Sequence, residues 1–432
     1  MKNTTEFAQG RALDVICLGR LAVDLYAQQI GSSLEDATSF AKYLGGSSAN
    51  IAFGTARLGL KSAMLSKVGD DHMGRFLTDT LAQEGCDVSH VGIDRERLTA
   101  LVMLGIKDKN TFPLIFYREN CADMAIDAAS VDAAFIASSK ALLITGTHFS
   151  TAAMHAVSTQ ALQLARANNV RTVLDIDYRP VLWGLSGKAD GETRFVSNEG
   201  VTKHLQAILP QFDLIVGTEE EFMIAGGGAD IMASLRAVRA ATLATLVVKR
   251  GPLGSAVIDS VVPASLDDAY NYRGVRVEVL NVLGAGDAFL SGFLKGWLRG
   301  EDYEACCRYA NGCGALVVSR HGCAPAMPSP VELDYFLANA AKLTRPDQDA
   351  TLARLHRTTV ARKQWNELCV FAFDHRTQFF ELAQQGGADE AKIARLKQLF
   401  VQAVGQTEAA RGLQGGTGVL IDDRYGVDAL ND

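Results

Sequence analysis

The sequence has little that would suit a secreted, membrane-bound or nucleic-acid-binding protein. Its eight cysteines include no C-x-x-C pair, and several lie in apolar runs such as Val15–Leu18, so we expect buried, reduced thiols. No apolar run approaches the roughly 20 residues of a membrane span, and Met1–Gly10 is too polar for a signal peptide. The net charge is −7 without any lysine- or arginine-rich run, so nucleic acid is not an expected partner. We therefore predict a cytoplasmic protein.

What the chain does have is length and apolar content. Its 432 residues exceed one ordinary domain and favour one large domain followed by an extension. Apolar residues make up 48% of the chain and charged residues 21%, which is enough to bury a sizeable core.

Short apolar runs alternate with amphipathic segments from Asp14 to about Ser319. The runs are rich in leucine and β-branched residues and end at a polar residue or glycine: Asp14–Leu18, Ala63–Val68, Ala141–Thr145, Arg171–Asp175, Asp213–Val216 and Leu246–Lys249. The segments with helical spacing are Ala49–Leu58, Gly74–Glu84, Ser150–Asn168 and Ile231–Ala241. This alternation predicts an α/β fold with a mostly parallel sheet covered on both faces. Ligands of such sheets bind at the carboxyl ends of the strands.

One region interrupts the alternation. Thr99–Ile106 and Phe112–Tyr117 are strand-like and flank the polar turn Lys107–Asn110, which predicts a hairpin rather than a crossover helix. We expect a small β-sheet lid built from residues of about 20–45 and 99–118.

The C-terminal part has a different character. Residues 1–335 form the predicted large domain, and 336–364 form a charged helical connector that Pro346 interrupts. The apolar run Cys369–Phe373 then ends at a polar Asp-His-Arg triplet and precedes a long helical pattern. Residues 365–432 therefore look like the beginning of a second α/β module, too short to complete one.

The segment Gly284-Ala285-Gly286-Asp287 is the most informative motif. Its small residues let backbone N–H groups approach an anion, and the helix expected to start there adds its dipole. A carboxylate at such a turn fits a general base that faces an acceptor hydroxyl while the amides hold a phosphoryl group. The alternative is a glycine-rich turn with Asp287 as an ordinary helix N-cap.

A second motif pairs Gly45-Gly46 with Asn50 at the start of a predicted helix. Paired glycines allow a sugar to lie against bare backbone, and an asparagine amide can both donate to and accept from hydroxyl groups. The alternative is a plain helix start with Ser47 or Ser48 as the N-cap.

Together these two motifs resemble the PfkB, or ribokinase-like, family of carbohydrate kinases, and the likeness covers about residues 13–330. The resemblance implies a three-layer α/β/α fold with a β-sheet lid, phosphoryl transfer from ATP to a sugar, and Asp287 as the base beside the anion hole of residues 284–286. Relatives often form dimers through such lids, so a homodimer is also possible.

The resemblance extends to metal ions. Asn281 stands where most members have aspartate at a position that supports a monovalent cation site, which puts a possible monovalent cation in doubt. Gly217 replaces the family's asparagine in the motif whose glutamate is Glu220, the expected ligand of Mg²⁺ through water. The alternative for Glu220 is a solvated, acidic helix start.

The resemblance also assigns the nucleotide side. Lys249, Gly251 and Gly254 match the loop beside the ATP phosphates and ribose, to which Gly286 also belongs. Asn311 matches a residue that borders the adenine pocket, although core packing explains its surroundings equally well.

On the sugar side, Asp24 matches a residue that accepts hydrogen bonds from vicinal hydroxyls, the alternative being a solvated turn aspartate. Arg118 and Arg179 resemble the positions at which gluconate-type members bind an acid, and guanidinium groups suit carboxylates. The alternative is a structural ion pair, for example of Arg118 with Glu119 or of Arg179 with Asp177.

Within the family, the motifs Asp175–Pro180, Gly217–Phe222 and Ser319–Cys323 look most like 5-dehydro-2-deoxygluconokinases of inositol catabolism. Cys369–Arg376 and Leu420–Gly426 resemble the opening of an aldolase-like module often fused to them. The implied reaction is phosphorylation of the C6 hydroxyl of 5-dehydro-2-deoxy-D-gluconate.

Other functions remain open at this point. A 2-keto-3-deoxygluconate kinase or a fructokinase would share the fold and the phosphate site. A catalytically inactive sugar-binding or regulatory protein is an alternative of another class, which the intact Gly284–Asp287 element disfavours. An aldolase would need a complete barrel.

Overall fold

The computed structural model describes residues 2–108, 111–187, 190–193, 195–360, 367–413 and 415–430. The chain divides into two compact units, Met1–Ala361 and Arg362–Asp432, and each is described here by itself. Among the described residues, no helix is both long and apolar enough to cross a membrane. All eight cysteines are free thiols, and seven of them are buried, as expected.

The first unit is built on a nine-stranded sheet with the order β13-β12-β11-β10-β9-β8-β1-β4-β5. Its strands, which include all six predicted runs, are β1 (Leu13–Leu18), β4 (Ser62–Gly69), β5 (Asp87–Asp94), β8 (Ser139–Thr145), β9 (Arg171–Asp175), β10 (Leu214–Thr218), β11 (Thr245–Lys249), β12 (Ser255–Ile258) and β13 (Tyr270–Tyr272). The strands from β11 to β5 pair in parallel, and only β12 and β13 are antiparallel. The predicted mostly parallel α/β sheet is confirmed.

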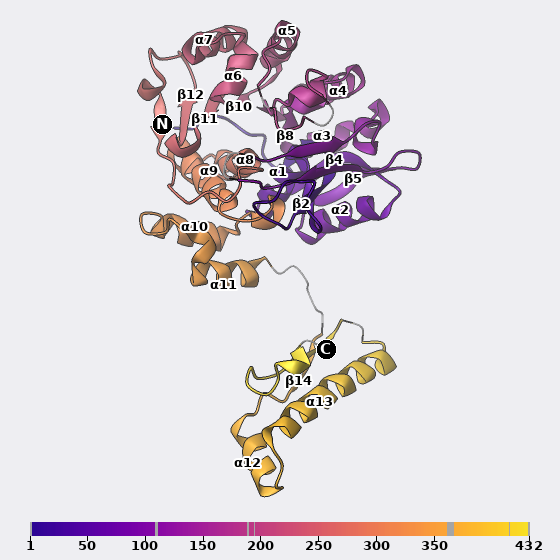
Figure 1. Cartoon of the computed structure of the whole chain (residues 1–432). Helices are drawn as coiled ribbons and strands as arrows, with labels where there is room; N and C mark the ends of the chain where they lie inside the picture. Colours follow the sequence, from indigo (N-terminus) through magenta and orange to yellow (C-terminus); the bar gives the residue numbers. More distant parts are fainter. Residues whose placement is uncertain are drawn as a thin grey trace. The chain divides into compact units, whose positions relative to one another are not determined.

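Alternate residues of the strands enter two separate cores, one on each face of the sheet. Val15 and Cys17 belong to one core, whereas Ile16 and Leu18 belong to the other. The first core is covered by α1 (Ser47–Arg57), α2 (His72–Gln83), α8 (Ala285–Trp297) and α9 (Tyr303–Val318). The second is covered by α3 (Ala133–Ala137), α4 (Ala152–Ala167), α5 (Glu199–Ile208), α6 (Glu219–Gly226) and α7 (Ile231–Ala241). Figure 1 shows this three-layer arrangement.

A second, four-stranded sheet has the order β3-β2-β6-β7. Its strands are β2 (Ala22–Ala27), β3 (Phe40–Gly45), β6 (Ala100–Leu104) and β7 (Leu114–Tyr117). β6 and β7 pair antiparallel, which confirms the predicted pair of strands. Lys109 and Asn110 of the predicted turn lie outside the described residues. The sheet has its own small apolar cluster, which includes Tyr26 and Leu283.

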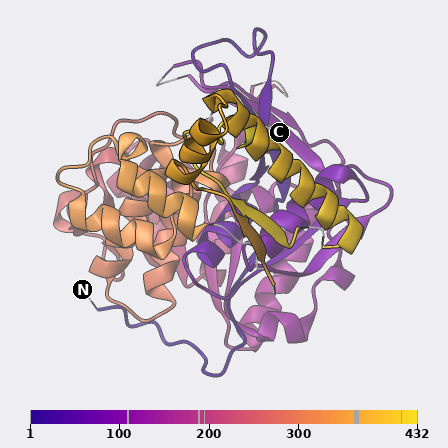
Figure 2. The same ribbon diagram turned by 90° about the horizontal axis from the view of Figure 1, so that it is seen from below.

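Residues 336–360 of the predicted connector belong to the first unit. They include the end of α10 (Pro330–Asn339) and all of α11 (Ala350–Thr359), and Pro346 lies in a short 3₁₀ turn between the two helices. Leu333, Phe336 and Leu352 are fully buried in the core shared with α8 and α9, so both helices are packed parts of this unit (Figure 2).

The second unit contains β14 (Cys369–Ala372), α12 (Thr377–Gln385), α13 (Glu390–Arg411) and β15 (Thr417–Leu420). β14 and β15 pair in parallel, as in a β-α-β unit. Lys397 of α13 is fully buried, and its ammonium donates to the carbonyls of Phe373 and His375 and to the Asp422 carboxylate. This polar cluster fixes α13 against the ends of both strands.

Candidate active site

Most of the predicted site residues gather at the carboxyl ends of the parallel strands. Asp175 is the last residue of β9 and Lys249 is the last residue of β11. Asn50 in the first turn of α1 contacts Asp287 in the first turn of α8, and the Lys249 ammonium borders Gly286 of the same turn, so both helix N-termini lie at this edge of the sheet. The edge is the usual ligand position of a doubly covered parallel sheet.

The N-terminus of α8 is open to an anion. Gly284 is the N-cap residue, with a φ of 79° and no side-chain capping bond. The Ala285 amide donates to the carbonyl oxygen of Val282 over 3.3 Å, so the amides of Gly286 and Asp287 are the ones that a side-chain cap would otherwise occupy. A Cβ at Gly284 would overlap the Sγ of Cys323, which is why this position requires glycine for both conformation and space. Asp287 is the third residue of the helix and not its cap, so the N-cap alternative is wrong.

Asp287 is held by a residue from the other half of the unit. The Asn50 amide Nδ2 donates to its Oδ2 over 2.8 Å. Burial raises the pKa of Asp287 to about 7, and Asp177 adds to the rise, while the Asn50 bond and the nearby Lys249 and Arg179 oppose it. A carboxyl with this pKa can accept a proton from a hydroxyl near neutral pH.

Lys249 brings a positive charge to the same place. Its Nζ lies 3.2 Å from where a Cβ on Gly286 would stand, so the ammonium borders the first turn of α8. The Nζ is 2.8 Å from the Asp175 carboxylate and 3.8 Å from that of Glu221. Burial lowers the pKa of Lys249, but the two carboxylates outweigh burial and leave it raised, so the lysine stays charged.

Gly45 and Gly46, the two glycines of the acceptor motif, form a tightly packed surface, called here the acceptor floor. A Cβ on Gly45 would overlap the Asp24 carboxylate, and one on Gly46, where φ is 95°, would overlap the carbonyl oxygen of Arg20. Asp24 lies within β2 and is 7% exposed, so it is not a solvated turn residue. Burial raises the pKa of Asp24 to about 6, and Arg20 opposes the rise.

Neither serine after the glycines caps α1. The N-cap residue is Gly46 without a side-chain bond, which makes the plain helix-start alternative wrong. The Ser47 hydroxyl instead donates to the Asp177 carboxylate over 2.5 Å, and Ser48 donates to the carbonyl of Leu18. Asp177 is one of three described non-glycine residues with a positive φ, here 33°, at the turn after β9.

The two predicted carboxylate-binding arginines are both in ion pairs. Arg179 Nε lies 3.3 Å from Asp177 Oδ1, the pair considered from the sequence, and its side chain is 22% exposed. Arg118 Nε lies 2.7 Å from Asp123 Oδ2 with side chains 2% and 0% exposed. The partner of Arg118 is thus Asp123 rather than Glu119, and the short turn at 122–124 that supplies it gave no signal in the sequence.

The nucleotide-side residues have different surroundings. Gly251 adjoins open space, whereas a Cβ on Gly254 would overlap the carbonyl oxygen of Tyr272. The Asn311 amide donates to Tyr272 and Ser255 over 3.3 and 3.4 Å, so this side chain supports the β12–β13 edge. Its bordering of an adenine pocket stays a prediction.

Two neighbouring glutamates in the first turn of α6, Glu220 and Glu221, differ in their surroundings. Glu220 is exposed, as its alternative interpretation expects, and its Mg²⁺ role stays a prediction. Glu221 is 8% exposed, completes a capping box with Thr218 and faces Lys249. The second of these glutamates is a site residue that the family motif did not single out.

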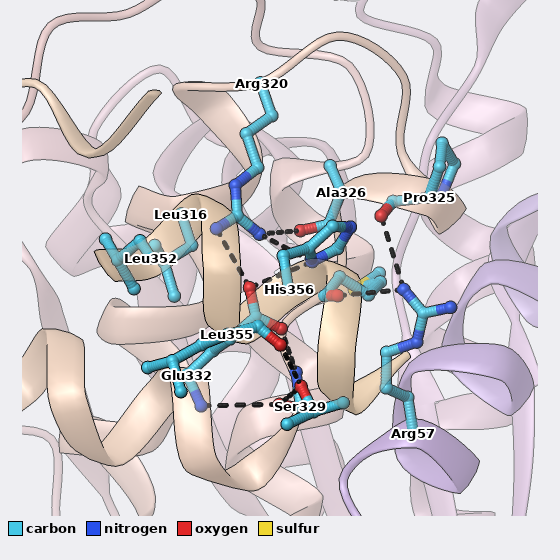
Figure 3. A network of polar contacts seen from close by, with 12 residues as sticks. Arg57, Leu316, Arg320, Pro325, Ala326, Ser329, Glu332, Leu352, Leu355 and His356 are labelled. Carbon is cyan, nitrogen blue, oxygen red and sulfur yellow. Dashed lines mark hydrogen bonds and ion pairs between the residues drawn. The ribbon is translucent and has the colours of Figure 1, made fainter. Parts of the chain in front are cut away.

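The loop at residues 281–284, which ends at Gly284, is held in place by a buried polar network. The Asn281 amide donates to the carbonyl of Arg320 over 2.9 Å, and its own oxygen accepts from the backbone of Leu283. Figure 3 shows Arg320 and His356 meeting on the carboxylate of Glu332, at 3.0 and 2.9 Å. Glu332 is fully buried in α10, so both connector helices help hold the loop that ends at the anion site.

A carboxylate with a raised pKa, helix amides without a side-chain cap and a charged lysine are together the groups that phosphoryl transfer uses. Residues 12–330 match the model of the pfkB family carbohydrate kinases. The chain therefore belongs to the pfkB family and is a sugar kinase. Residues 332–432 match a second model, described as an uncharacterized protein conserved in bacteria (DUF2090).

Individual proteins agree with this assignment. A 5-dehydro-2-deoxygluconokinase of Bacillus anthracis is 34% identical over 349 residues, which are 79% of this chain and 99% of that protein. The crystal structure of a PfkB protein from Polaromonas sp. JS666 has a TM-score of 0.62 and 27% identity over 75% of this chain and 99% of that one. An E. coli structure with ATP and Mg²⁺ has a TM-score of 0.66 at 21% identity, over 76% and 99% of the chains, which supports the fold.

Proposed function

We propose that this sugar kinase phosphorylates the C6 hydroxyl of 5-dehydro-2-deoxy-D-gluconate with ATP, giving the 6-phosphate and ADP in myo-inositol catabolism. The name of the B. anthracis relative supports the choice of substrate. The observation that carries it is the group of arginines beside the acceptor floor: Arg20 has Arg118 and Arg179 among its electrostatic neighbours. A neutral sugar would bring Arg20 no charged partner, whereas a sugar acid brings a carboxylate; Arg118 and Arg179 already contact Asp123 and Asp177.

The acceptor is held by the floor of the site. Asp24 accepts hydrogen bonds from sugar hydroxyls, and the bare backbone of Gly45 and Gly46 lets the sugar approach. Asn50 orients the Asp287 carboxylate through the 2.8 Å bond from its Nδ2. Asp287 takes the proton of the C6 hydroxyl as that oxygen attacks the terminal phosphate of ATP.

The phosphoryl group is held by the opposite wall. The amides of residues 284–286 and the ammonium of Lys249 stabilise the negative charge on its equatorial oxygens. We propose that Gly251, Gly254 and Asn311 border the rest of the nucleotide. The small sheet closes over the sugar as a lid and excludes water, which limits ATP hydrolysis.

The residues present fit a Mg²⁺ ion that binds mainly to nucleotide phosphates. The described part of the chain contains no cluster of three His, Cys, Asp or Glu side chains suited to hold a metal. Glu220, exposed in the first turn of α6, would hold such an ion through water, as a hard cation that keeps its hydration allows. The ion neutralises charge on the transferring phosphate when it is bound.

The side chain at 281 argues against a monovalent cation ligand at that position. The Asn281 Nδ2 donates to the carbonyl of Arg320 and its Oδ1 accepts from the Leu283 amide, so both ends of this uncharged side chain already have partners. We propose that this amide supports the loop in the absence of a cation. A homodimer through the small sheet remains a further proposal, for which sedimentation of the purified protein is the direct measurement.

The experiment is a panel of acceptors incubated with ATP and Mg²⁺. ADP release is measured with 5-dehydro-2-deoxy-D-gluconate, 2-keto-3-deoxygluconate and fructose, and the phosphorylated carbon is located by ³¹P–¹H NMR. We expect the highest kcat/KM with the first acid and a phosphate at C6. A higher kcat/KM with another acceptor would reject the proposed substrate, and no transfer to any acceptor would favour a binding protein.

A further inference from the structure

The three arginines near the sugar floor are not equivalent, because only one lacks an acceptor. Arg118 is committed to Asp123 in a pair closed to solvent, with its Nη2 also 3.7 Å from the Met154 sulfur. Arg179 contacts Asp177. Arg20 is 7% exposed, its Nε is buried without a hydrogen bond, and the described residues supply no acceptor for its guanidinium.

The position of Arg20 places this unpaired cation in the sugar site. It is the second residue after β1, at the carboxyl end of that strand. Its Cγ lies 3.3 Å from where a Cβ on Gly46 would stand, so its stem borders the acceptor floor. Its Cζ is 5.5 Å from the centre of the Phe116 ring on β7, so the small sheet covers one face of the guanidinium. Stacking on a ring leaves the N–H groups at the edge free for an anion.

The nearby carboxylates do not neutralise Arg20 directly. Asp24 and Asp177 are its electrostatic neighbours, but the described residues include no ion pair between either of them and Arg20 within 4.0 Å. Asp24 is packed against Gly45, and Asp177 accepts from Ser47 and contacts Arg179. Because a buried guanidinium without a hydrogen-bond acceptor is costly, a protein that retains one has a use for it in a bound state.

We propose that Arg20 is the residue that binds the substrate carboxylate and sets the preference for sugar acids, whereas Arg118 holds the end of β7 in place through Asp123. This proposal rests on the proposed function insofar as the acceptor is an acid, but not on which acid it is. Under this proposal, the Asp24 carboxylate accepts hydrogen bonds from the hydroxyls of the sugar acid, and the Arg20 guanidinium binds its carboxylate.

The test compares Arg20→Gln with the wild type on a sugar acid and a neutral acceptor. The acid is the best acid substrate of the wild type, and the neutral acceptor is fructose. We expect KM for the acid to rise about 10- to 100-fold, the worth of a charge-assisted pair of hydrogen bonds, with a smaller change in kcat. The ratio of kcat/KM for acid over neutral sugar should fall by a similar factor. Arg20→Lys keeps the positive charge but not the two parallel N–H donors of a guanidinium. Its KM for the acid should lie between those of the wild type and Arg20→Gln.

Two further measurements separate this role from a structural one. Thermal unfolding of Arg20→Gln should stay close to that of the wild type, because no partner loses its ion pair. Arg118→Gln should lower the Tm, because Asp123 would remain buried and unpaired. An unchanged KM for the acid in Arg20→Gln, or an equal loss for acid and neutral sugar, would overturn the proposal.

The panel of acceptors measured with the wild type tests the proposed substrate and the Arg20 inference separately. If the wild type prefers another sugar acid, the proposed substrate is wrong, and the Arg20 variants still test the carboxylate site. If the wild type phosphorylates only neutral sugars, the inference about Arg20 is overturned as well.

Discussion

Asp287 lies where burial and the start of a helix act on its charge in opposite directions. The dipole and free amides of α8 favour the carboxylate, as does the bond from Asn50, whereas burial and Asp177 favour the neutral acid. The result is a group that changes charge near pH 7.

Replacing Asp287 by asparagine keeps the shape of the side chain and removes the base. We expect kcat to fall by about 10²- to 10⁴-fold, the usual contribution of a positioned general base, while KM for the sugar changes much less. Steady-state kinetics with ADP detection measures both. Asp79→Asn, the same exchange on the exposed face of α2, is the control and should behave like the wild type. A kcat within a few-fold of wild type would remove Asp287 from this role.

Activity should depend on pH through the same carboxyl. Because the pKa of Asp287 is raised to about 7, acidification below neutrality protonates the base and removes it. The value of kcat/KM should therefore rise with pH and reach its plateau above pH 8, and at pH 6 it should be about one tenth of the plateau. Asp24, with a pKa of about 6, should add a second loss below pH 6. A profile that is flat between pH 5.5 and 8 would contradict this assignment.

The sequence identified individual residues where a motif and its chemistry were local. The small residues at 284–286 and the glycine pair at 45–46 could be assigned because the need for bare backbone is visible in the residue type. The ion pair of Arg118 with Asp123 could not be predicted because tertiary packing sets it, and Arg20, which we propose as the carboxylate-binding residue, was not considered for the same reason. A signal for Arg20 did exist, since it directly follows Gly19 at the end of the first predicted strand.

At the scale of helices and strands, the buried parallel strands were the most predictable elements. Continuous β-branched and leucine runs bounded by polar residues predicted β1, β8 and β9 to within one or two residues. The antiparallel strands β12 and β13 at one end of the large sheet were not predicted, because they are short and give weak alternation. The connector was predicted to begin at residue 336, but α10 begins at Pro330, because Ser329 and Glu332 form a capping box.

The buried carboxylate of Glu332 should matter to this group of elements. Glu332→Gln keeps a side chain able to complete the capping box but removes the charge that Arg320 and His356 share. We expect the free energy of unfolding to fall by about 3 kcal/mol, as for other broken buried pairs, measured by urea denaturation. The control is Glu199→Gln, which breaks the exposed pair with Lys203 and should change little. Equal stability of the two variants would contradict this role for the network.

For the whole molecule, the division into two units separates the kinase site from the C-terminal module. Every residue assigned to catalysis or substrate binding lies in Met1–Ala361, whereas the second unit has its own buried cluster around Lys397. The pfkB match ends at residue 330, but α10 and α11 contribute buried side chains to the kinase core. The compact unit is therefore longer than the family match.

A chain that ends after Val360 should remain an active kinase. We expect its kcat with the preferred sugar to lie within about three-fold of the full chain, because it retains the whole core. A chain that ends after Asn339 lacks Leu352 and His356 and should be less stable by at least the 2–5 kcal/mol typical of losing one buried leucine. Thermal unfolding and kinetics of both chains are the measurements. A folded Val360 chain without activity would show that the second unit takes part in the reaction.

The bond between Asn50 and Asp287 joins residues 237 positions apart. No nascent chain can make this contact before about two thirds of its 432 residues have been synthesised. The base that we propose is therefore oriented only after α1 and α8 have packed together. Recovery of catalysis during refolding should accordingly lag behind recovery of helical structure.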